Sequence, residues 1–250
     1  MTLVTALGMV LAFQALPPMD FNTNLQMLLR WIHLLAGIIW IGLLYFFNLV
    51  NVPVMKALDG TTKGKVIPVL LPKALWWFRW GAVVTVLAGI IYYLIILSLE
   101  PAKAPGSLMW TTFGKWLLLV VVTWAIIYFL IGPVNNGWLL ALLVVILVGA
   151  MGGAIVHWNA YEDASNRALS IGVGGGIGTI MLLNVWGIIW PAQKRIIAWT
   201  KANAEQGTPV PPESAKLARR AFLASRTNFW LSIPMLFFMA AASHYPMFGG

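Results

Sequence analysis

Long apolar stretches with few charged residues dominate this sequence. Six apolar runs cover residues 25–50, 75–98, 116–132, 138–156, 168–190 and 228–243. Most are close to the ~20 residues that a helix needs to cross the ~30 Å hydrocarbon core of a bilayer. Backbone groups in lipid must be hydrogen-bonded within the chain, and the runs lack the alternation of barrel strands, so they predict helices. The sequence therefore predicts an all-α, polytopic transmembrane helix bundle of about six long spans.

Composition supports a lipid environment. Charged residues make up 9% of the chain and hydrophobic residues 60%, whereas a soluble domain has about 25% charged residues. The net charge of +9 comes from Lys and Arg placed between the apolar runs, which indicates membrane topology and argues against nucleic-acid binding. The sequence has no cysteine, which excludes disulfides, thiolate ligands and a c-type haem attachment motif within it.

The first residues form a separate apolar segment. Residues 1–16 carry no charge and are followed by Pro17 and Pro18. Because no Lys or Arg precedes the apolar stretch, as one would in a signal peptide, we expect residues 1–18 to form a short N-terminal membrane helix. We expect residues 1–250 to make one transmembrane domain.

The basic residues predict the orientation. The loop at 51–74, the turn at 133–137 and the segment at 191–227 share one side of the predicted topology. Together they hold eleven positive residues: Lys56, Lys63, Lys65, Lys73, Lys194, Arg195, Lys201, Lys216, Arg219, Arg220 and Arg226. The positive-inside rule places this side in the cytoplasm, so the C-terminus is expected on the outer side.

The segment 191–227 is predicted to be a cytoplasmic amphipathic connection. Its pattern predicts a helix extension to about Gln206, a break at 207–212 and a basic helix to about Ser225. Such a helix can attract anionic lipid head groups or dock a partner.

The three histidines, His33, His157 and His244, lie in or beside three different apolar runs, all toward the outer side. His33 is the deepest, about eight residues or roughly 12 Å inside its helix. Ionisable groups inside membranes are costly and mark functional sites. His33 and His244 are therefore candidate metal ligands of a b-type haem, for which neutral imidazole is a usual axial ligand. His244 could instead be an interfacial cap.

Arg30 and His157 are expected to have different roles. Arg30 lies one turn before His33 and could neutralise a haem propionate. His157 is expected to be an ordinary interfacial residue.

The glycine run and the carboxylates bear on two other functions, nucleotide binding and transport. The run from Gly172 to Gly178 follows no strand and does not fit a nucleotide-binding loop. Its small-xxx-small pairs favour close helix packing, or the close approach of a flat macrocycle. The predicted spans contain no paired carboxylates, which argues against a transporter built on an Asp/Glu relay.

Several motifs in order resemble one family. Leu29-Arg30-Trp31-Ile32-His33 with Ala36-Gly37, Trp77-Phe78-Arg79-Trp80, Ile177-Gly178-Thr179, Trp190-Pro191-Ala192-Gln193-Lys194-Arg195 and Ser243-His244-Tyr245-Pro246 resemble the membrane domain of bacterial membrane-bound urate oxidases. The resemblance covers most of residues 25–250. It implies a helical domain in the bacterial inner membrane with a periplasmic C-terminus, and it carries over His33 and His244 as candidate ligands.

The resemblance has clear departures. The family has further histidines at the positions of Trp76, Gly172 and Thr227, and an acidic residue at that of Gly81. Its C-terminal cytochrome c domain has no counterpart within residues 1–250.

These observations leave several functions open. The first is an electron-transfer subunit that binds haem b between His33 and His244 and exchanges electrons with a periplasmic cytochrome c, alongside other membrane subunits. The second is a cofactor-free structural or accessory subunit of a larger respiratory or photosynthetic complex. Urate oxidation by the chain alone and transport are further alternatives.

Overall fold

The computed structural model describes residues 20–99, 107–159 and 164–248, and every regular element in these ranges is helical. The elements are α2 (Phe21–Tyr45), η1 (Phe46–Asn51), α3 (Val52–Ala57), α4 (Gly60–Leu99), α5 (Ser107–Leu130), α6 (Gly137–Asn159), α7 (Asn166–Asn184), η2 (Val185–Ile189), α8 (Trp190–Gln206) and α9 (Glu213–His244). The two η segments are π-helical turns that join neighbouring helices without a break. The predicted helix at 1–18 lies outside the described residues.

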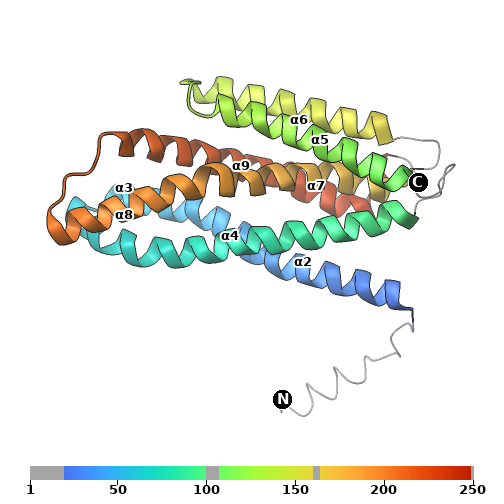
Figure 1. The fold of residues 1–250 in the computed structure, drawn as a ribbon, viewed down its shortest axis with the longest axis horizontal. Helices are drawn as coiled ribbons and strands as arrows, with labels where there is room; N and C mark the ends of the chain where they lie inside the picture. Colours follow the sequence, from blue (N-terminus) through green and yellow to red (C-terminus); the bar gives the residue numbers. More distant parts are fainter. Residues whose placement is uncertain (1–19, 100–106, 160–163, 249–250) are drawn as a thin grey trace, which may run out of the picture.

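The all-α bundle predicted from the apolar runs is confirmed, and each of the six runs lies in one long helix (Figure 1). Five continuous helices within the described ranges are long and apolar enough to cross a membrane: Phe21–Ala57, Gly60–Leu99, Met109–Leu130, Gly137–Trp158 and Asn166–Gln206. Helix α9 is more polar but packs along α7. Outward-facing apolar side chains such as Phe129 and Val145 are 73% and 67% exposed. The chain is a multi-pass membrane protein whose outer surface contacts lipid.

The region 51–74 was expected to be a loop, and this expectation is wrong. It forms α3 and the first part of α4, whose start is capped by Asp59, with the backbone N–H of Thr62 donating to the carboxylate at 3.0 Å. Pro68 and Pro72 lie inside α4. Each proline removes one helical hydrogen bond, but α4 packs against α8 here, and this packing outweighs the local cost.

The segment after the sixth apolar run follows the predicted pattern in part. Helix α8 ends at Gln206, and Gly207 takes the left-handed conformation, φ 66°, that ends a helix there. The predicted break at 207–212 is confirmed. The basic helix and the last span, however, are one continuous helix, α9.

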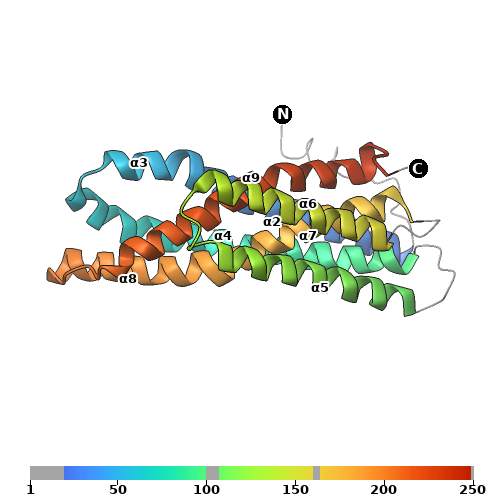
Figure 2. The same ribbon diagram turned by 90° about the horizontal axis from the view of Figure 1, so that it is seen from above.

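The basic connections meet at one end of the bundle, as the topology predicted. Arg219, near the start of α9, donates hydrogen bonds of 3.2 Å to the carbonyls of Gly132, Val134 and Asn135 in the α5–α6 turn. Beyond this turn, α3, α8 and the first parts of α4 and α9 extend further from the bundle (Figures 1 and 2).

Helix α7 lies at the centre of the bundle, and its glycines allow the neighbouring helices to pack closely against it. A Cβ at Gly176 would lie 3.2 Å from side-chain atoms of Met151 and Val120, and one at Gly174 would lie 2.7 Å from the methyl group of Met239. The predicted use of this glycine run in close helix packing is therefore confirmed.

Buried amides connect α7 to α9. The Asn184 Nδ2 donates to Asn228 Oδ1 at 2.8 Å, and Asn228 Nδ2 donates to the carbonyl of Met181 at 2.9 Å. Both asparagines are fully buried. Asn184 directly precedes the π-helical turn η2, and an interruption of the regular ladder of this kind is common near functional sites.

We predict that Asn228→Leu lowers the free energy of unfolding by about 1–3 kcal/mol, because it leaves the buried amide of Asn184 without its acceptor. Thermal unfolding in detergent micelles measures the loss, and Asn22→Leu, at an exposed position, is the matched control. If Asn228→Leu unfolds at the temperature of the unsubstituted protein, the amide pair does not stabilise the bundle.

Candidate cofactor cavity

A cavity of about 640 Å³ lies toward the end of the bundle where α2 begins and α9 ends. Helix α2 packs on α4 and α7 packs on α9, and the cavity separates these two pairs. Its size falls within the range of roughly 300–1,000 Å³ that is typical of cofactor sites. The lining is largely apolar and includes Leu29, Ile38, Ile41, Val86, Ile90, Ile171 and Leu236.

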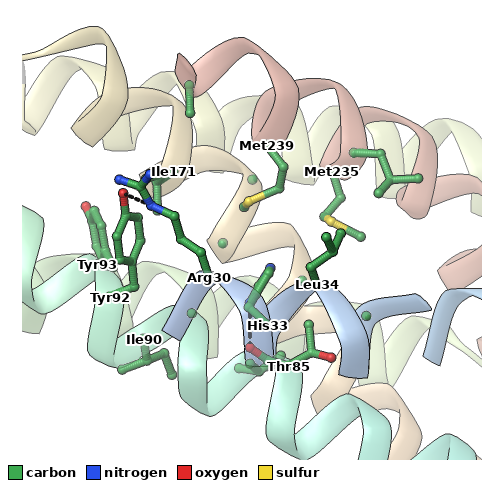
Figure 3. Close-up of a pocket in the computed structure, with 18 of the residues that line it drawn as sticks. Arg30, His33, Leu34, Thr85, Ile90, Tyr92, Tyr93, Ile171, Met235 and Met239 are labelled. Atoms are coloured by element: carbon green, nitrogen blue, oxygen red, sulfur yellow. Dashed lines mark hydrogen bonds between the residues drawn. The ribbon is translucent and has the colours of Figure 1, made fainter. Parts of the chain in front are cut away.

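His33 is held by a backbone carbonyl of α4. Its Nδ1 lies 2.8 Å from the carbonyl oxygen of Thr85. A carbonyl oxygen only accepts, so Nδ1 carries the proton and Nε2 keeps its lone pair for another partner. Figure 3 shows the ring standing in the cavity with its free nitrogen turned away from Thr85. In metal-binding histidines the second ring nitrogen is typically fixed by a carbonyl or carboxylate in the same way.

Gly89 makes the room for this ring. A Cβ at Gly89 would lie 3.1 Å from both Cε1 and Nδ1 of His33, which is closer than ordinary van der Waals contact. Gly89 lies one helical turn after Thr85, so its missing side chain exposes the carbonyl that His33 uses. Sequence analysis had singled out His33 but gave no signal for Thr85 or Gly89.

Arg30 lines the same cavity as His33, from the same helix. Its Nε donates a hydrogen bond of 2.8 Å to the hydroxyl of Tyr92, and its guanidinium lies 5.0 Å from the centre of that ring. The two ion pairs found among the described residues do not include Arg30. Because this guanidinium pairs with no carboxylate of the described residues and lies at the edge of an apolar cavity, it is suited to an anionic group of a ligand.

The other two histidines occupy different environments. His244 is the last residue of α9; it lines the cavity and is exposed. His157 lies near the end of α6, is exposed, and does not line the cavity. The structure thus brings His33, Arg30 and His244 to one cavity and leaves His157 outside it.

Two methionines that the sequence analysis did not single out also face this cavity. Met235 and Met239 are one turn apart on α9, across the cavity from His33 (Figure 3). Both pack over the glycines of α7, with a Cβ at Gly178 lying 3.8 Å from Met235 Cγ. Their four-residue spacing was visible in the sequence, but methionines in an apolar helix are more often packing residues.

Further features of the lining suit a flat ligand. Gly37 and Gly42 of α2, Gly89 of α4, and Gly174, Gly175 and Gly178 of α7 all line the cavity, so three of its walls are partly bare backbone. Trp40 also lines it, is 1% exposed, and has an indole N–H with no hydrogen-bond partner in the structure. A buried donor of this kind is costly unless a ligand or water accepts from it.

At Gly172 the resemblance to urate oxidases implies a histidine, but the neighbouring side chains leave no room for one. A Cβ at Gly172 would lie 3.0 Å from the Tyr93 hydroxyl and 3.2 Å from Ile155. The indole N–H of Trp116 donates to the Gly172 carbonyl at 2.7 Å. Tyr93 and Ile155 therefore occupy the space that a side chain at this position would need.

The side chains that could bind a metal bear on which kind of metal site is possible. Within the described parts of the chain, no three His, Cys, Asp or Glu side chains gather as they would around a zinc ion. A metal that brings most of its own ligands, as the iron of haem does, needs only one or two axial donors from the protein.

Comparison with known proteins shows to which family the chain belongs. The family model described as "Urate oxidase N-terminal" matches residues 57–250. No curated protein and no solved structure gives a significant match. The chain belongs to the urate oxidase N-terminal family, as the sequence motifs predicted.

We predict that His33 carries its proton on Nδ1 and that Gly89→Ala disturbs this bond, because the new methyl group lies against the ring. Nitrogen-15 NMR of histidine-labelled protein in bilayers reports the protonated nitrogen. Gly42→Ala is the control, since Gly42 lines the cavity and a Cβ there meets nothing within 4 Å. A proton on Nε2 in the unsubstituted protein would contradict the assignment.

Proposed function

We propose that this protein is an inner-membrane electron-transfer subunit that binds one b-type haem in the cavity between α2, α4, α7 and α9. The observation that carries the proposal is His33, whose Nδ1 is fixed on the Thr85 carbonyl and whose Nε2 is free in the cavity. Family membership supports the assignment to a membrane subunit, and the cavity is the site that we propose for the cofactor.

The residues present fit a haem. The cavity is large, mainly apolar and walled in part by glycine, which suits a flat macrocycle. His33 would supply an axial nitrogen, and His244 is a second candidate ligand from the same cavity. Arg30, oriented by Tyr92, would pair with a propionate. Trp40 would donate its unpartnered N–H toward a ligand atom.

When bound, haem b would supply a one-electron carrier. The protein's contribution would be to exclude water with an apolar lining and to hold one axial nitrogen in a fixed orientation. Burial and axial ligation are the levers that set the reduction potential of such a site.

The electron partner we propose is a periplasmic cytochrome c, with other membrane subunits around it. The basic end of the bundle, by the positive-inside rule, faces the cytoplasm. The cavity lies toward the opposite end, where α2 begins and α9 ends (Figure 1). A haem there would be close to the outer surface and within reach of a soluble electron carrier.

We predict that protein purified after expression with added haem shows a reduced b-type spectrum, with about one haem per chain. His33→Ala should lose most of this absorption, because it removes the axial nitrogen, whereas His157→Ala should keep it. The haem should be extractable, since the chain has no cysteine to attach it. Folded, haem-supplied protein without these bands would instead support a cofactor-free accessory subunit.

We also predict that the C-terminus is periplasmic. The chain has no cysteine, so a single introduced cysteine is its only thiol. In spheroplasts, an impermeant maleimide should label Tyr245→Cys directly and Gln206→Cys only after lysis. The reverse pattern would place the cavity toward the cytoplasm and contradict transfer to a periplasmic carrier.

A further inference from the structure

The structure offers a thioether donor opposite His33. We propose that Met239 supplies the second axial ligand of the haem, so that His33 and Met239 form a mixed histidine–methionine pair. This inference rests on the proposed haem site and names a ligand of that site. It departs from the pair His33 and His244 that the sequence suggested.

The position of α9 relative to His33 is the first argument. In Figure 3 the His33 ring points toward the turn of α9 that carries Met235 and Met239. Two axial donors lie about 4 Å apart across a metal, given metal–nitrogen and metal–sulfur bonds of about 2.0–2.3 Å. His244 is five residues beyond Met239, which is about 7.5 Å further along the helix. The donors of α9 that Figure 3 shows opposite His33 are the thioethers of Met235 and Met239.

Burial separates His244 from the methionines. Met235 is 7% exposed, Met239 is half-buried, and His244 is exposed at the end of its helix. An axial ligand that faces an enclosed macrocycle is shielded from solvent. His244 is better placed at the rim of the cavity, near the expected propionates.

The two methionines are not equivalent. The Met235 side chain lies over Leu34, whereas the Met239 sulfur points toward the space above the His33 ring (Figure 3). Met239 is also positioned from behind, since its methyl group fills the space left by the missing side chain of Gly174. Any residue larger than glycine at 174 would push this sulfur out of place.

Thioether ligation has a defined chemical consequence. A methionine sulfur is soft and neutral, so it stabilises ferrous over ferric iron more than a second imidazole does. Histidine–methionine ligation consequently raises the reduction potential of a haem relative to bis-histidine ligation. A higher potential suits a site that accepts electrons from a donor and passes them to a cytochrome c.

The test compares haem-loaded wild type, Met239→Leu, Met235→Leu, His244→Ala and Met151→Leu, a core control outside the cavity. Leucine conserves the volume of methionine. We expect wild type to show the iron–sulfur charge-transfer absorption of ferric protein. Met239→Leu alone should lose it, with a lower midpoint potential and new binding of added imidazole. A further variant, Met239→His, offers an imidazole in place of the thioether and should again give a low-spin spectrum.

The outcomes separate the two proposals. If hemin added to any of these proteins gives no shifted Soret band that stays with the protein after gel filtration, the haem site itself is wrong. If haem binds and Met239→Leu leaves the absorption and the potential unchanged, while His244→Ala or Met235→Leu alters them, the haem site stands and the assignment of Met239 is overturned. If haem binds and none of the substitutions changes these properties, Met239 is equally excluded.

Discussion

Inside a bilayer, each polar group of the chain must find its partner in the protein, and this requirement organises the whole structure. Backbone groups are satisfied within long helices. Buried side chains pair across helices, as Asn184 and Asn228 do between α7 and α9. The interaction on which the functional account depends is of the same kind: the Thr85 carbonyl accepts from His33 Nδ1, and Nε2 is left facing the cavity without a hydrogen-bond partner among the described residues. A free imidazole nitrogen in an apolar cavity is what a metal-bearing cofactor would complete.

Small residues make this arrangement possible. Gly89 leaves space for the His33 ring, and the glycines of α7 let α9 approach closely enough to place its methionines over them. Large side chains have the opposite role. Tyr93, together with Ile155, fills the space beside Gly172 and so closes a position for which the resemblance implies a histidine. The cavity is thus shaped by where side chains are missing as much as by where they are present.

Much of the fold could be predicted from the sequence, because apolar runs of membrane-spanning length leave few structures to choose from. The part of the fold that the sequence predicted wrongly lies at the basic end of the bundle. Residues 51–74, which lie between two apolar runs and carry four lysines, were expected to form a loop, but α4 packs on α8 and continues as a helix through Pro68 and Pro72. The site was predictable only in part. His33 stood out as an ionisable residue deep in a span, whereas Met239 looked like any other core methionine until α9 was placed opposite α2.

The central claim is that the cavity beside His33 holds a haem, and a cryo-electron microscopy map of the purified full-length protein in a lipid nanodisc tests it most directly. The account predicts planar density between the α2–α4 and α7–α9 pairs, joined to His33 Nε2, with Arg30 at its edge. Acyl-chain density in the cavity, with no connection to His33, would contradict it.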